Sequence, residues 1–130
     1  MKRAPRWIDK QSLLLLHDES LSLFGGARGI RDEGLLDSAL ARPVNKFLYE
    51  TIGDLAELAA AYAHGIVKNH AFVDGNKRAA FLSLGLFLAI NGKRLRAKPV
   101  DAIHIVVALA AGELDEVELA QWIRLHMKNR

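Results

Sequence analysis

Hydrophobic residues in this chain recur mostly every three or four positions, which is the spacing of one face of an α-helix. No stretch alternates between apolar and polar residues for long enough to indicate a sheet. The pattern therefore predicts an all-α fold, a single-domain bundle of about six helices around one central apolar helix.

Two helices are predicted in the first part of the chain. The first covers about residues 9–24 and ends at two glycines, which supply the backbone freedom that a helix end needs. Asp32 can cap a short second helix, which we expect Pro43 to end because proline has no N–H to donate, leaving residues 44–51 irregular. The residues expected to face inward are Leu13, Leu14, Leu21 and Phe24 in the first helix and Leu35, Leu36, Ala39 and Leu40 in the second.

The remaining helices are predicted from clearer local signals. A third helix over about residues 54–68 leads to His70, and the next, over about residues 76–90, is apolar nearly all round, as expected of a covered central element. Pro99 suits the first turn of a fifth helix, and Asp115 with Glu118 forms a capping pair that opens a sixth.

Composition limits the chemistry that is available. The chain has 130 residues, of which 51% are hydrophobic, and this is enough for one compact domain over residues 1–130. The absence of cysteine excludes disulfides and a thiol nucleophile and suits a cytoplasmic protein. The basic start of the chain has no apolar signal core, and the longest apolar stretch is shorter than the roughly 20 residues that cross a bilayer, so no membrane partner is expected. The net charge of +3 suits an anionic partner, whether a nucleotide, a nucleic acid or an acidic protein, and does not choose among them.

The segment HAFVDGNKR, residues 70–78, concentrates polar residues between two strongly patterned helices. Gly75 and the free N–H groups at the start of the central helix favour a phosphate. Asp74 offers an oxygen ligand for Mg²⁺, which usually takes only one or two carboxylates from a protein. His70 is a candidate base because an imidazole titrates near neutral pH. We expect Phe72 to turn inward and hold the loop on the core.

Taken singly, these residues have ordinary structural explanations. A histidine at a helix end offsets the helix dipole, and Asp74 and Asn76 are common capping residues. Lys77 and Arg78 alone would form a solvated first turn. Their combination at this spacing is what indicates a phosphate-handling site.

The segment resembles the signature loop of Fic-domain proteins, HxFx(D/E)GNGR. The wider chain resembles the Doc (death-on-curing) branch in LHD at residues 16–18, FGG at 24–26, GIRDEGLLDSALARP at 29–43, and NGKRL after the central helix. The resemblance extends over roughly the whole chain and implies a Fic/Doc fold.

The resemblance also implies a role for each residue, with ATP and Mg²⁺ as cofactors. His70 would be the general base that deprotonates a target hydroxyl, and Asp74 would be the magnesium ligand. Phosphates would be cradled by Gly75, Asn76 and Lys77, with their charge neutralised by Arg78. Phe72 would anchor the loop.

Two departures from the Fic pattern bear on the reaction. Lys77 replaces the second glycine of GNG, as in Doc toxins, and Phe81 stands where many Fic proteins carry a second arginine. In the Doc branch the lysine is thought to reverse ATP, so that the γ-phosphate is transferred and the protein is a kinase. Gly75 follows the general Fic pattern, which keeps AMP transfer open as an alternative.

The resemblance further implies partners. A Doc toxin would phosphorylate a Ser or Thr hydroxyl of translation elongation factor Tu and be neutralised by a cognate antitoxin, since the inhibitory (S/T)xxxE(G/N) motif of other Fic proteins is absent here. Operator DNA would be reached only indirectly, through the antitoxin. The sequence also fits a non-catalytic module that bridges antitoxins and, less well, an RNA-cleaving toxin.

Several remaining features are interpreted as structural. The basic run at residues 93–98 is expected to be solvated surface. His64 lies six residues before His70, a spacing that fits no helical pair of zinc ligands, and it is expected to face away. No role is assigned to the histidines at positions 17, 104 and 126. Phe47 and Tyr49 are expected in a loop after Pro43, where Fic relatives carry a flap that guides the target.

Overall fold

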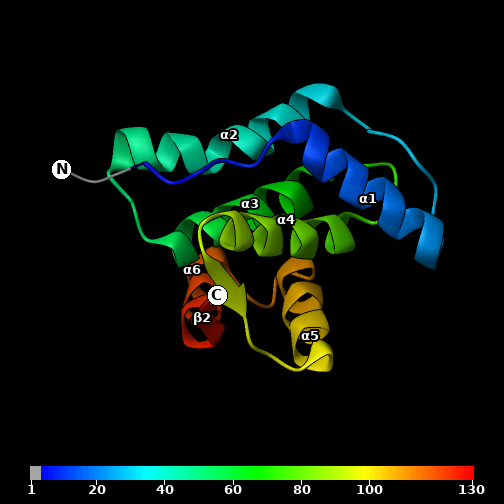
Figure 1. Ribbon diagram of the computed structural model, residues 1–130. Helices are drawn as coiled ribbons and strands as arrows, with labels where there is room; N and C mark the ends of the chain where they lie inside the picture. Colours follow the sequence, from blue (N-terminus) through cyan, green and yellow to red (C-terminus); the bar gives the residue numbers. More distant parts are fainter. Residues whose placement is uncertain (1–3) are drawn as a thin grey trace.

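The computed structural model describes residues 4–130, so the basic start of the chain lies partly outside the described residues. Six helices and one two-stranded antiparallel sheet follow one another along the chain (Figure 1), which confirms the predicted all-α class. The elements are α1 (Lys10–Phe24), α2 (Glu33–Glu50), α3 (Leu55–Asn69), α4 (Asn76–Ile90), β1 (Lys93–Leu95), α5 (Pro99–Ala110), α6 (Glu116–His126) and β2 (Met127–Asn129). Within the described residues, no helix combines the length and hydrophobicity needed to span a membrane.

The centre of the bundle is shared by α3 and α4. Helix α3 packs against α2, α4, α5 and α6, while α4 packs against α1, α3 and α5. Figure 1 shows α1 and α2 on one side of this pair and α5 and α6 on the other. Small residues make the close approach possible: a Cβ on Gly65 of α3 would lie 3.2 Å from the Cα of Ala39 on α2. The α3–α4 pair therefore forms the frame that carries the loop between them.

The second helix is longer than the sequence suggested. We expected Pro43 to end it, but α2 continues through Pro43 to Glu50, so residues 44–50 are helical instead of irregular. Proline removes one backbone donor, yet Pro43 is buried together with Leu36 and Ala39 on the face that packs on α3. Burial of this face outweighs the missing hydrogen bond. Phe47 consequently lies on a helix, with its ring 5.8 Å from that of Trp7.

The predictions for α1 are partly confirmed. Leu13 and Leu21 are buried, but Phe24, expected to face inward, is 75% exposed. It is the last residue of the helix, beyond the reach of the core, and its ring lies 6.0 Å from the guanidinium carbon of Arg78 on α4.

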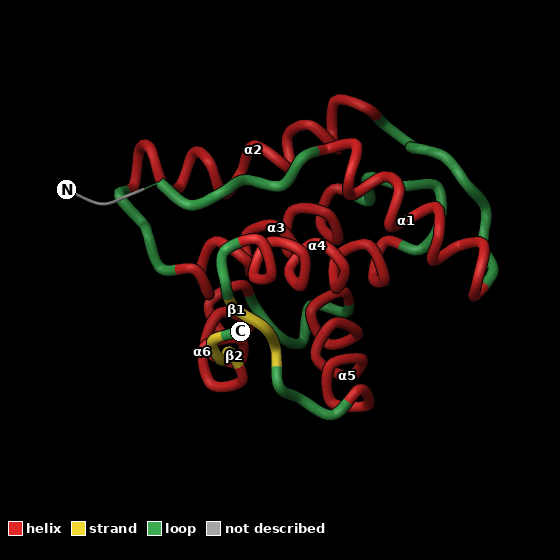
Figure 2. Tube along the Cα trace, viewed as in Figure 1, coloured by secondary structure: helices red, strands yellow, loops and turns green. Residues whose placement is uncertain are grey.

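The small sheet was not predicted. Strand β1 lies beside β2 (Figure 2) and pairs with it antiparallel. Arg94 lies opposite Lys128, and each strand has only three residues. Three residues are too few to display the alternation by which a strand is recognised. The basic run at residues 93–98 therefore lies partly in β1, where it joins the end of the chain to the end of α4.

Candidate functional site

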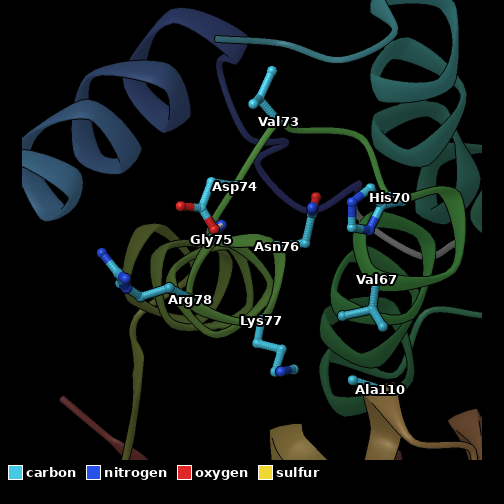
Figure 3. A pocket seen from close by; sticks show the side chains of 9 residues that line it. All are labelled: Val67, His70, Val73, Asp74, Gly75, Asn76, Lys77, Arg78 and Ala110. Atoms are coloured by element: carbon cyan, nitrogen blue, oxygen red, sulfur yellow. Dashed lines mark hydrogen bonds between the residues drawn. The ribbon is translucent and has the colours of Figure 1, made fainter. Parts of the chain in front are cut away.

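A pocket of about 470 Å³ opens at the amino end of α4 (Figure 3), within the range of small-molecule sites. The end of α3, the loop over residues 70–75 and the first turn of α4 form most of its wall, and α5 contributes its last residue. The lining residues are Val67, His70, Val73, Asp74, Gly75, Asn76, Lys77, Arg78 and Ala110.

His70 ends α3 in the left-handed conformation, with φ 49° and ψ 55°. Its N–H donates to Val67 O at 3.2 Å, and its own carbonyl accepts a hydrogen bond from Nε of Arg31 at 2.7 Å. A second nitrogen of Arg31 donates to Asn69 O at 2.9 Å. The Arg31 guanidinium thereby satisfies the carboxyl end of α3 and fixes the backbone of His70. The imidazole itself is exposed and makes no hydrogen bond within residues 4–130.

The loop is held from behind by the segment that precedes α2. Arg31 N–H donates to Ala71 O at 2.9 Å, and Val73 N–H donates to Gly29 O at 3.0 Å. Phe72 forms an isolated bridge with Ile30 and is only 1% exposed. The predicted inward orientation of Phe72 is confirmed, and this side chain lies behind the pocket instead of lining it.

The side chain of Asn76 is engaged in holding the same loop. Its Oδ1 accepts the Phe72 N–H at 2.8 Å, and its Nδ2 donates to Phe72 O at 2.9 Å. Asn76 is also buried. Since both ends of the amide are used, Asn76 can serve an anion through its backbone N–H.

Helix α4 begins without a side-chain cap. Its N-cap is Gly75, in the left-handed conformation with φ 72°, and no side chain in the described residues accepts from the first turn. The first N–H groups of a helix have no partner within the helix, and they carry the positive end of its dipole. The start of α4 is thus open to an anion, and it lies in the wall of the pocket.

The carboxylate of Asp74 is fixed by two backbone donors. Its Oδ2 accepts from Ala27 N–H at 3.1 Å and its Oδ1 from Gly75 N–H at 2.8 Å. These two hydrogen bonds, with the charge of Arg78 adding to them, lower the pKa of Asp74, so the group is ionised at neutral pH. Each oxygen keeps a lone pair for a cation.

The two basic residues in the first turn of α4, Lys77 and Arg78, differ in whether other residues hold their side chains. Lys77 is exposed and has no hydrogen bond or ion pair within residues 4–130. Arg78 uses Nη1 to donate to Ser20 O at 3.2 Å and Gly25 O at 3.1 Å, which ties it to the carboxyl end of α1. Figure 3 shows His70 on one side of the amino end of α4, and Asp74 and Arg78 on the other.

Sequence reasoning missed two residues that hold the loop, His17 and Arg31. His17 is buried, and its Nε2 lies 3.1 Å from the carbonyl oxygen of Asp74. Both lie 39 or more positions from their partners in the loop, so no local pattern could reveal the contacts. The only signal was their place in the LHD and GIRDEG segments of the family resemblance.

The donor set fits Mg²⁺ bound with phosphates better than a metal held by protein alone. No group of three or more His, Cys, Asp or Glu able to hold a metal occurs in the described residues. Mg²⁺ commonly takes one or two carboxylates and completes its shell with phosphates and water, and Asp74 supplies one ionised carboxylate beside the open helix end. His64 instead faces Glu116 of α6, with Nε2 3.9 Å from Oε1.

Comparisons with known proteins identify relatives of this chain. The sequence model of the Fic/DOC family matches residues 7–88. The chain is 34% identical over 119 residues to "Protein kinase doc" of Escherichia phage P1, covering 92% of this chain and 94% of that protein. It is 45% identical over 75 residues to "Toxin Doc" of Mycolicibacterium smegmatis, covering 57% of this chain and 58% of that protein. The matched residues 7–88 contain the whole loop and the segments that hold it.

Proposed function

Because the chain belongs to the Fic/Doc family, we propose that it is a Doc-type toxin kinase that transfers the γ-phosphate of ATP to a Ser or Thr hydroxyl of a cellular protein. The observation that carries the proposal is the uncapped start of α4 beside a free Lys77, an ionised Asp74 and an unpaired His70 within the described part of the chain. Phosphoryl transfer needs positioning and charge stabilisation, and these groups offer both in one pocket.

The pocket can hold a triphosphate by several independent contacts. The backbone N–H groups of the first turn of α4 and the ammonium of Lys77 would bind phosphate oxygens, and Arg78 would add its charge nearby. Asp74 would hold Mg²⁺, which when bound neutralises phosphate charge. Since Ala27 and Gly75 orient this carboxylate in the free protein, it needs little rearrangement on binding.

His70 would act as the general base. Its backbone is held by Val67 and Arg31, while its exposed imidazole can accept the proton of the target hydroxyl. The hydroxyl oxygen would then bond to the γ-phosphorus as the bond from that phosphorus to the β-bridging oxygen breaks, and ADP would leave. The proton remains on the imidazole until solvent removes it.

Lys77 is the residue that would select γ-phosphate transfer. A glycine at this position leaves space beside the helix start, whereas Lys77 places a long cationic side chain there (Figure 3). We propose that it occupies or ligates the position that an α-phosphate would need for AMP transfer.

The target and the inhibitor are proposed by resemblance. By resemblance to Doc proteins, the substrate would be elongation factor Tu in the cytoplasm, and its modification would arrest translation. A cognate antitoxin would neutralise the toxin and would connect it indirectly to operator DNA.

The position of the label decides the reaction. Purified protein is incubated with elongation factor Tu and either γ-labelled or α-labelled ATP, with Mg²⁺ present. We expect label on the factor from the γ position alone, and loss of it in His70→Ala and Asp74→Asn because the base and the metal ligand are gone.

Lys77→Ala should weaken transfer because it removes a proposed phosphate contact. Its matched control is Lys128→Ala, since Lys128 is an exposed lysine on β2, away from the pocket. Transfer from the α position by the unaltered protein would replace the kinase proposal with AMP transfer. No label from either position, together with full folding, would contradict both activities toward elongation factor Tu.

A further inference from the structure

His17 of α1 makes a polar contact with the loop over residues 70–75, although it does not line the pocket. Its side chain is 1% exposed, and its Nε2 lies 3.1 Å from the carbonyl oxygen of Asp74, 57 positions along the chain. Its ring packs on Phe72 with 4.1 Å between ring centroids. One buried imidazole thus contacts two residues of the loop.

The contact shows that Nε2 of the ring carries hydrogen. A carbonyl oxygen only accepts hydrogen bonds, so Nε2 of His17 carries the hydrogen and donates it to Asp74. Nδ1 is buried and has no partner within the described residues. Burial lowers the pKa of His17, which keeps the ring neutral with Nδ1 bare.

The peptide that His17 holds is the junction between the carboxylate and the helix start. The Gly75 N–H of this peptide donates to Oδ1 of Asp74, while the Asp74 carbonyl receives the hydrogen from His17. Rotation of the peptide would therefore move the Asp74 carboxylate and the N-cap of α4 together. His17 restrains that rotation.

The backbone also lies directly against the ring. A Cβ added to Gly75 would lie 2.9 Å from Cε1 of His17, closer than real Cβ atoms approach other atoms. The loop is thus seated on the imidazole by contact as well as by a hydrogen bond.

We propose that His17 is a positioning residue, whose Nε2–H fixes the Asp74–Gly75 peptide so that the carboxylate and the open start of α4 keep the relation that a metal-bound triphosphate requires. The activity part of this proposal rests on the proposed function, and its structural part does not. The competing explanation is that His17 only fills the core.

Two substitutions of nearly equal size separate these explanations. His17→Gln keeps an N–H donor at the end of an unbranched side chain, and His17→Met has similar length and volume without a donor. Both lose the aromatic contact with Phe72 equally, so a further fall in the melting temperature of the Met variant would report the lost hydrogen bond. If His17 positions the loop, Gln should keep kcat for phosphate transfer within about threefold, and Met should lower it about tenfold or more, the equivalent of one hydrogen bond.

Measurements without nucleotide keep the proposal testable if the protein is not a kinase. Long-range ¹H–¹⁵N spectra of the ring should show hydrogen on Nε2 and none on Nδ1. Amide exchange at Gly75 and Ala27 should quicken in His17→Met and stay slower in His17→Gln. Ser83→Ala is the control, because the buried hydroxyl of Ser83 donates to Ala80 O within α4 and should leave both amides unaffected.

Each result decides one question. A ring with hydrogen on Nδ1 and none on Nε2, or equal kinetics and exchange in the Gln and Met variants, overturns the positioning role. If the unaltered protein transfers no phosphate, the proposed function fails, and the ring spectrum and the two exchange rates still decide whether His17 fixes the loop.

Discussion

At the scale of the single residue, the site depends on Gly75, whose backbone conformation and surroundings favour glycine. Gly75 adopts φ 72°, in the left-handed region, and it leaves the start of α4 uncapped. The same position touches the ring of His17, where a Cβ would be 2.9 Å from Cε1. Conformation and close contact therefore both disfavour a side chain here.

Gly75→Ala should be destabilising for these two reasons. Left-handed backbone at a residue with a Cβ costs about 1–2 kcal/mol, and displacement of the His17 ring adds to that cost. Urea denaturation should show a lower free energy of unfolding. Gly85→Ala is the control, because Gly85 lies within α4 with open space around its Cβ position, and it should stabilise by about 0.5–1 kcal/mol. Equal stability of Gly75→Ala and the unaltered protein would contradict this account.

At the scale of the helix and the loop, the elements with local signals were the ones predicted well. The capping box of Asp115 and Glu118 and the bounds of α4 follow from residues close to each helix end. The prediction that Pro43 ends the second helix was wrong because burial of the α2 face against α3, a tertiary effect, outweighs the missing backbone donor. The site shows the same difference between local and long-range features. The segment from His70 to Arg78 could be recognised in the sequence, whereas the contact of His17 with it could not.

Helix α6 is joined to α2 and α3 through a half-buried cluster around Glu116. Its Oε1 pairs with Arg42, its Oε2 lies 3.4 Å from Nζ of Lys46, and His64 of α3 is nearby. Burial alone would raise the pKa of Glu116, but the hydrogen bond and charge of Arg42, aided by Lys46, outweigh it and lower that pKa. Burial lowers the pKa of His64, so it is neutral at pH 7.

Glu116→Gln should therefore reduce stability in a pH-dependent way. Because the folded pKa of Glu116 is below its usual value of 4.5, its contribution is present above that value and disappears as the pH falls through the lower folded pKa. We expect a loss of about 1–3 kcal/mol at pH 7 that shrinks toward zero in acid, measured by urea denaturation at several pH values. Glu113→Gln, an exposed control, should change little at any pH. A loss that stays constant down to about pH 3 would contradict the role of the charge.

At the scale of the whole molecule, the pocket is an assembly of separate parts of the chain. Helix α1 supplies His17, and α1 with its C-cap Gly25 supplies the carbonyls that hold Arg78. The segment before α2 supplies Arg31, while α3, the loop after it, α4 and the last residue of α5 line the pocket. A ligand that binds this assembly binds the folded state alone, because no short piece of chain contains the complete set. Binding must therefore be coupled to global stability.

Magnesium and ATP together should raise the melting temperature of the protein. A ligand present at about 100 times its Kd stabilises the folded state by about 2.7 kcal/mol, which corresponds to several degrees for a domain of this size. Scanning calorimetry with Mg²⁺ and ATP should show this shift, and Asp74→Asn and Lys77→Ala should each diminish it because each removes a group proposed to hold the metal ion or a phosphate. Lys128→Ala should keep the full shift, since that lysine lies on β2. An unchanged melting temperature at millimolar Mg²⁺ and ATP would contradict the proposed kinase and favour a non-catalytic role, because a folded state that gains no stability from the nucleotide does not bind it.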